Sequence, residues 1–107
     1  MNKLSDANFS KEAGAGTGLV LIMFSAAWAG PCNLVRPDFE MVASRFGNQI
    51  GFGEFDLDDN PMTPQLYGVR QLPMFLLLKD GVPQAAKAGA IPMELLVEVC
   101  EGALSRK

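Results

Sequence analysis

The chain contains no histidine, and only two of its residues are cysteines. Without histidine, imidazole acid–base catalysis, histidine-dependent triads and histidine metal sites are excluded. Cys32 and Cys100 lie far apart, which argues against a secreted scaffold stapled by disulfides. Asp56, Asp58 and Asp59 lack the spacing and the glycine of an EF-hand loop, so we expect a solvated turn there, and neither a metal nor a cofactor.

The chain also lacks a long apolar run and a basic stripe. No run reaches the roughly 18 apolar residues that a membrane span needs, and the opening segment MNKLSDANF lacks the apolar stretch of a secretory signal. The 9 lysines and arginines are outnumbered by 12 aspartates and glutamates, and both signs are spread along the sequence. We therefore expect an intracellular, cytoplasmic protein without nucleic-acid or membrane partners.

What the chain does have is enough apolar material for a well-filled core. Hydrophobic residues make up 49% of its 107 positions, which argues against disorder. A chain of this length has room for one globule, so we expect residues 1–107 to form a single domain.

Hydrophobic periodicity predicts helices that alternate with strands. The continuous apolar run LVLIMF is typical of a central strand buried on both faces, and the stripe of the last helix predicts a buried structural thiol at Cys100. The predicted elements are a helix at 5–13, a strand at 19–24, a helix ending at 46 and kinked at Pro37, a strand at 50–57, a short helix at 62–67, a hairpin of strands at 74–78 and 82–87, and a C-terminal helix. This order predicts an α/β fold in which about four helices flank a central mixed β-sheet.

The segment Trp28-Ala29-Gly30-Pro31-Cys32 carries the chemical interest, because it lies where the central strand gives way to a helix. Helix N-termini present unpaired N–H groups and partial positive charge, which lower the pKa of a cysteine placed there. The residue at that first position is Ala29, which has no thiol.

This segment resembles the active-site segment of the thioredoxin family, whose usual pattern is Trp-Cys-Gly-Pro-Cys. The resemblance covers nearly the whole chain, and it implies a thioredoxin fold and a disulfide reductase that acts on disulfide-containing proteins and receives electrons from a thioredoxin reductase. Further segments similar to the family are Asp58-Asp59-Asn60-Pro61, Tyr67-Gly68-Val69-Arg70, Leu72-Pro73, Lys79-Asp80-Gly81 and Gly89-Ala90.

The resemblance implies that Ala29 stands in the place of the nucleophilic cysteine and that Cys32 is the resolving cysteine. In the family's reaction the first thiolate attacks a substrate disulfide, and the second cysteine then opens the mixed disulfide. With Ala29 in place the first step has no nucleophile. We expect Cys32 to be shielded, with a normal or raised pKa, so the chain as written is predicted not to exchange disulfides.

The resemblance also implies a substrate-binding surface. Pro73 would follow a cis peptide bond, and the backbone of Leu72 and Pro73 would pair with an extended substrate segment as an added strand. Taken alone, Pro73 could be an ordinary proline at the start of a strand. The other residues implied for this surface are Trp28, Gly30, Pro31 and Gly89.

Besides Ala29, further positions depart from the family pattern. Met23 stands where many thioredoxins have a buried aspartate that accepts the proton of the resolving cysteine, and Glu54 stands at the matching lysine position. One hypothesis is that Glu54 supplies a relocated carboxylate with a pKa raised by partial burial; the alternative is a solvated residue near a strand end. Ser25, where an aromatic residue often occurs, either shifts partner choice or reflects packing variation.

Two functions fit these residues. The first is a thioredoxin whose nucleophilic cysteine has been changed to alanine, a pattern that suggests an engineered variant. The second is a natural, redox-inactive thioredoxin-like module that binds proteins through Trp28, Gly30, Pro31 and Pro73. A third interpretation, single-cysteine chemistry at Cys32, predicts rapid alkylation of that thiol in the native protein.

Overall fold

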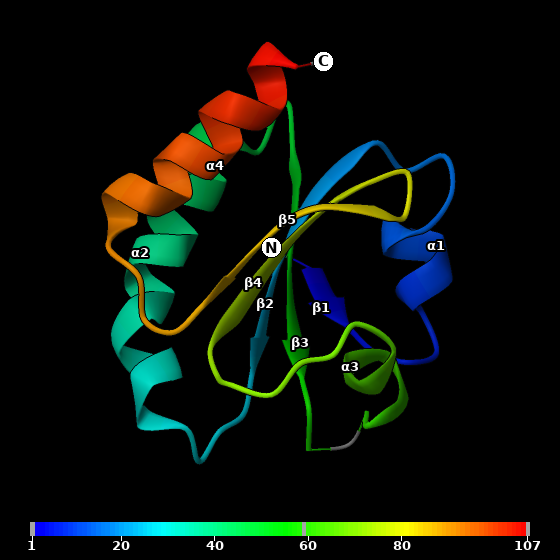
Figure 1. Cartoon of the computed structure of the whole chain (residues 1–107), viewed down its shortest axis with the longest axis vertical. Coiled ribbons are helices and arrows are strands. Elements are labelled where there is room, and N and C mark those ends of the chain that lie inside the picture. Colours follow the sequence, from blue (N-terminus) through cyan, green and yellow to red (C-terminus); the bar gives the residue numbers. More distant parts are fainter. Residues whose placement is uncertain (1, 59, 107) are drawn as a thin grey trace.

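Five strands form one mixed sheet in the order β1-β3-β2-β4-β5 (Figure 1). The structure, a computed structural model, describes residues 2–58 and 60–106, so Asp59 lies outside the described residues. The first three strands in the sheet order run parallel, and β4 is antiparallel to both of its neighbours. The strands are β1 (Asn2–Leu4), β2 (Leu19–Ser25), β3 (Gly51–Asp56), β4 (Met74–Lys79) and β5 (Val82–Ala88).

Two layers of helices cover the sheet (Figure 1). The longer helices α2 and α4 pack on one face, and α1 and α3 lie on the other. The predicted mixed sheet with four flanking helices is therefore confirmed. The helices are α1 (Phe9–Ala13), α2 (Gly30–Phe46), α3 (Met62–Leu66) and α4 (Met93–Ser105).

Strand β2 supplies side chains to both cores, because every one of its residues is buried. Successive side chains of a strand point to opposite faces. Leu21 and Met23 accordingly join the core under α2 and α4, whereas Ile22 and Phe24 join the core under α1 and α3. The prediction of a central strand buried on both faces is confirmed.

The N-terminal segment differs from the prediction. Strand β1 was not expected, since it has only three residues and only Leu4 among them is buried. The predicted helix at 5–13 is shorter than expected and starts at Phe9. Before it, the Asn8 amide donates to Ser5 Oγ at 3.2 Å while the Ser5 amide donates to Asn8 Oδ1 at 2.7 Å, a reciprocal pair like that of a capping box across the turn at 6–8 that leads into the helix.

The fold brings two connections to the same end of the sheet. Because β4 is antiparallel to β2, the start of β4 lies beside the end of β2, and Phe24 pairs with Met74. The turn that enters α2 and the loop that enters β4 therefore meet at the lower end of Figure 1. Within the described part of the chain, no helix is long and apolar enough to cross a membrane.

Candidate functional site

The turn between β2 and α2 places Ala29 at the N-cap of α2. Its side chain is 5% exposed and belongs to a small cluster with Ala26 and Cys32, against which the half-buried Leu72 packs. Its amide donates to the Ala26 carbonyl at 3.1 Å. The helix N-terminus thus presents a methyl group where the family pattern has a nucleophilic sulfur.

Cys32, three residues further on, is fully buried with 0% exposure. Burial raises the pKa of its thiol, and this effect outweighs the opposing influence of a backbone hydrogen bond with Ala26 and of the Arg36 charge. The predicted shielding of Cys32 is confirmed. Cys32 and Cys100 are both free, and Cys100 lies in the core under α4 with a pKa raised to about 11 by burial.

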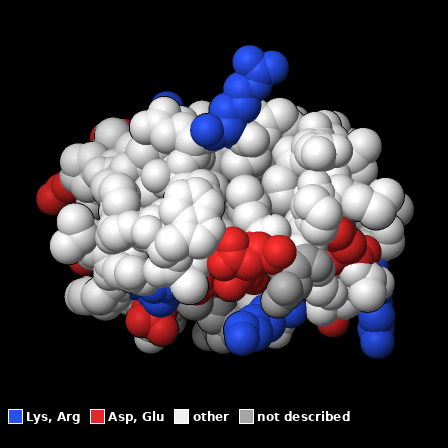
Figure 2. Space-filling view, turned by 90° about the horizontal axis from the view of Figure 1, so that it is seen from below, with Lys and Arg blue, Asp and Glu red and all other residues white. Residues whose placement is uncertain are grey.

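A groove of about 470 Å³ opens beside Ala29. Trp28, Gly30 and Pro31 line it together with Ala29, and the other lining residues are Leu57, Val69, Arg70 and Leu72. Trp28 is 72% exposed, and its Nε1 donates to Asp58 Oδ1 at 2.8 Å, which orients the indole ring. Figure 2 looks onto the molecule from this side, where most of the surface is uncharged.

The loop before β4 supplies the backbone of this groove. The bond between Leu72 and Pro73 is cis, as predicted. The Pro73 carbonyl accepts a hydrogen bond from the Gly89 amide at 2.8 Å, so Pro73 and Gly89 lie together but do not line the groove. Within the described residues, neither the N–H nor the carbonyl of Leu72 has a hydrogen-bond partner.

A profile of the family described as Thioredoxin matches residues 1–101. The chain belongs to the thioredoxin family. It is 36% identical over 104 residues to a thioredoxin of Rhodospirillum rubrum, covering 97% of this chain and 100% of that protein. It is 37% identical to a thioredoxin of Listeria monocytogenes over 92% of this chain and 94% of that one, and 31% identical to thioredoxin 1 of Synechococcus elongatus over 92% of both. The predicted thioredoxin fold is confirmed.

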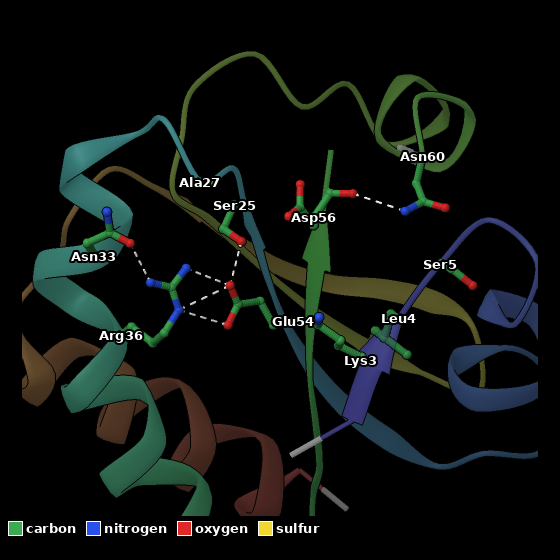
Figure 3. A pocket seen from close by; sticks show the side chains of 10 residues that line it. All are labelled: Lys3, Leu4, Ser5, Ser25, Ala27, Asn33, Arg36, Glu54, Asp56 and Asn60. Carbon is green, nitrogen blue, oxygen red and sulfur yellow. Dashed lines mark hydrogen bonds and ion pairs between the residues drawn. The ribbon is translucent and has the colours of Figure 1, made fainter. Parts of the chain in front are cut away.

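Beside the thioredoxin motif lies an ion-paired network that the sequence did not predict (Figure 3). Arg36 Nη2 donates to Glu54 Oε2 at 2.6 Å, Arg36 Nε lies 3.0 Å from Glu54 Oε1, and Ser25 Oγ donates to Glu54 Oε2 at 2.7 Å. Arg36 Nη1 donates to Asn33 Oδ1 at 2.6 Å. The network lines a hollow of about 560 Å³ that also reaches Lys3 of β1.

The expectation for the pKa of Glu54 was wrong. Burial alone raises this pKa, but the hydrogen bonds from Arg36 and Ser25 and the Arg36 charge outweigh burial and lower it. The solvated alternative is wrong as well, since the side chain is only 20% exposed and is hydrogen-bonded. Among the described residues no hydrogen bond joins Glu54 to Cys32, and a proton-accepting role for Glu54 stays a prediction.

Arg36 is the functional-site residue that sequence reasoning missed. It follows Cys32 by four positions, so both side chains lie on one face of α2. The sequence did contain a signal for this role, since Arg36 shares a helical face with the buried Cys32, Val35 and Phe39. A charged side chain on a buried face needs a partner of opposite charge or a hydrogen bond. Across residues 2–58 and 60–106, no group of three or more cysteine, aspartate or glutamate side chains is arranged to hold a metal.

Proposed function

We propose that this member of the thioredoxin family, acting as one domain over residues 1–107, binds extended protein segments in the groove beside Ala29 and does not exchange disulfides. The supporting observation is the alanine at the N-cap of α2, with the nearest thiol, Cys32, fully buried behind it. For the partners that the family implies, the chain would have no accessible thiolate to attack the disulfide of a protein substrate and no disulfide for a thioredoxin reductase to reduce. Binding at this site is therefore non-covalent.

The second candidate is a disulfide reductase inactivated only by a cysteine-to-alanine change at position 29. Against it stand the other departures from the pattern. Met23 is fully buried and pairs in register with Glu54, whose carboxylate is held by Arg36. A single substitution at Ala29 does not account for this network, so we favour a natural, redox-inactive module.

A disulfide-reduction assay tests the proposal. The reduction of insulin by dithiothreitol is followed with and without the chain, and we expect the same rate in both, because no accessible thiolate is present. Ala29→Cys introduces the thiol, yet we expect little turnover, since Met23 has no group that accepts a proton and the carboxylate of Glu54 is ion-paired with Arg36. Ala27→Cys, on an exposed position of the same turn, controls for the presence of an added thiol. Full turnover by Ala29→Cys, or acceleration by the unmodified chain, would establish the reductase instead.

Binding is measured through Trp28, the only tryptophan of the chain. We expect its emission to change saturably when a reduced, carboxymethylated unfolded protein is added. Gly30→Arg should abolish the change, because a Cβ at Gly30 meets nothing within 4 Å and the longer side chain fills the groove without disturbing the fold. Leu66→Arg, on the exposed face of α3 and outside the groove, is the matched control. A titration without any change in emission contradicts the proposed binding.

The structure does not favour single-cysteine chemistry at Cys32. A fully buried thiol with a raised pKa carries little thiolate at neutral pH. We expect iodoacetamide to label Cys32 only as fast as the protein opens, and to label it rapidly in denaturant. Rapid native labelling would reinstate the single-cysteine interpretation. The cytoplasmic location expected from the sequence stays a prediction.

A further inference from the structure

Among the residues that the structure describes, one charged residue, Arg70, lines the groove beside Ala29. Among the described residues its guanidinium has neither a hydrogen bond nor an ion pair, whereas Arg36 is fully engaged by Glu54 and Asn33. Asp58, the nearest described acidic residue to the Trp28 ring, does not line the groove, and one of its carboxylate oxygens accepts from the indole. The groove therefore offers an unpaired cation to whatever it binds.

Apart from Arg70, the described residues that line the groove are apolar or glycine. The methyl group of Ala29 stands where the family pattern has sulfur, Leu72 packs against its cluster, and Trp28 lines the same groove. A side chain seated there gains from apolar burial and aromatic contact and has no covalent bond to form. An apolar side chain suits this position better than a disulfide, which would meet no reacting partner.

The backbone of Leu72 selects an extended occupant. Its N–H and carbonyl are unpaired within the described part of the chain, while the neighbouring Pro73 carbonyl is already taken by Gly89. A strand added along Leu72 would satisfy both groups. Alternate side chains of such a strand point to the same face, so several can enter the groove together.

We propose that the groove binds a cysteine-free, extended polypeptide segment that places an apolar side chain over Ala29 and an acidic side chain against Arg70. This inference rests on the proposed binding function and specifies the class of partner. It separates the chain from the two-cysteine pattern of the family, because the charge and the apolar side chain of the partner, and not a disulfide, are the features recognised.

Acetylated, amidated seven-residue peptides test the inference. They share a central valine and carry glutamate, glutamine or lysine on both sides of it, and binding is read from Trp28 emission at low and at physiological salt. We expect the glutamate peptide to bind about 5-fold more tightly than the lysine peptide, with the difference shrinking as salt rises. Replacing the valine by serine should weaken binding by about 10-fold.

Charge reversal assigns the effect to one residue. In Arg70→Glu the lysine peptide should bind more tightly than the glutamate peptide. Lys79→Glu, on an exposed position at the far end of β4, is the control and should leave the two affinities unchanged. Equal binding of all three peptides overturns the inference and leaves the proposed function standing. If neither the peptides nor the carboxymethylated protein bind, both the proposed function and this inference fail. Tighter binding of a peptide that carries a mixed disulfide in place of the valine also overturns the inference.

Discussion

At the scale of single residues, the departures from the thioredoxin pattern belong together. The resemblance implies an aspartate and a lysine at two positions in many thioredoxins, and here those positions hold the buried Met23 and its register partner Glu54 on the neighbouring strand. The cation now comes from Arg36 on α2, so the ion pair joins a helix to the sheet. Ser25 contributes a hydrogen bond at 2.7 Å to Glu54 from a position where a larger aromatic ring would occupy the same space.

A double-mutant cycle on Arg36 and Glu54 tests this network. Arg36→Met leaves a half-buried carboxylate without its main partner, and we expect a loss of about 1–3 kcal/mol in the free energy of unfolding. Glu54→Gln should cost less, and the double variant should recover part of the loss. The exposed pair Arg45–Glu101, at 3.7 Å, is the matched control, with an expected coupling of at most about 0.5 kcal/mol. Additive losses at Arg36 and Glu54 would contradict a coupled network.

The same pair makes stability depend on pH. Because the folded pKa of Glu54 lies below its ordinary value of 4.5, its contribution is fully present above that value and is lost as pH falls through the folded pKa. Urea titrations between roughly pH 6 and pH 3 measure how the free energy of unfolding falls with pH. We expect it to fall less steeply in Glu54→Gln than in the unmodified chain. If the free energy of unfolding fell with pH equally steeply in Glu54→Gln, other carboxylates would be responsible for the acid sensitivity.

The residues of the thioredoxin motif could be located from the sequence, whereas the ion pair between Arg36 and Glu54 could not. Ala29, Cys32 and the cis bond before Pro73 lie in a contiguous or strongly patterned context, so the resemblance placed them correctly. The pKa of Glu54 depends on Arg36, which is 18 positions away in the chain and approaches it only after α2 packs on the sheet. Charge and burial oppose each other at Glu54, and only the folded geometry decides their balance.

At the scale of elements, the short helix α3 is held by the N-terminal segment. Asp6 accepts hydrogen bonds from the amides of Thr63 at 2.8 Å and Met62 at 3.2 Å, and its own amide donates to Asn60 Oδ1 at 3.1 Å. An isolated helix of five residues is far below the length that is stable in water. Its first turn therefore depends on a carboxylate more than fifty positions away.

Substituting Asp6→Asn tests this attachment. Desolvation raises the pKa of Asp6, but hydrogen bonds from Thr63 and Met62 outweigh it and lower the pKa, so the attachment is complete above the ordinary value of 3.8 and is lost as pH falls below it. We expect the Met62 and Thr63 amides to exchange with deuterium about 5-fold faster or more in Asp6→Asn at pH 7. Glu98→Gln, on the exposed side of α4, should leave their exchange unchanged. Full protection of both amides in Asp6→Asn would contradict the role of the carboxylate.

The prediction of helices and strands failed where a segment was too short to show a hydrophobic periodicity. The run 19–24 and the stripe of the last helix were long enough to identify β2 and α4. Strand β1 has three residues, of which two are exposed, and its existence depends on a parallel partner, β3, some fifty positions away. The segment 5–8 does contain the capping residues Ser5 and Asn8, which pair reciprocally, but residues 6–8 form a turn and the helix itself begins at Phe9.

At the scale of the whole molecule, stability comes from two separate cores without a covalent link. One core lies under α2 and α4, where Phe39 packs against Phe52 and Phe75 with ring centroids 5.7 and 5.6 Å apart. The other lies under α1 and α3, where Phe55 contacts Phe9 and Phe24. Both cysteines are free and buried in α2 and α4, so the native protein has no thiol pair to oxidise.

The free energy of unfolding should consequently be the same with and without dithiothreitol, because an oxidised form of the native chain does not exist. Ala29→Cys changes this, since positions 29 and 32 already pack in one cluster and a bond between them would close a four-residue loop. Such a loop is expected to stabilise the oxidised variant by about 2 kcal/mol over its reduced form, a difference that chemical denaturation at fixed protein concentration resolves. Ala27→Cys, exposed on the same turn, should gain no such dependence. If the unmodified chain itself became less stable in reductant, a covalent link would have to exist in solution, and the redox-inactive assignment would fall with it.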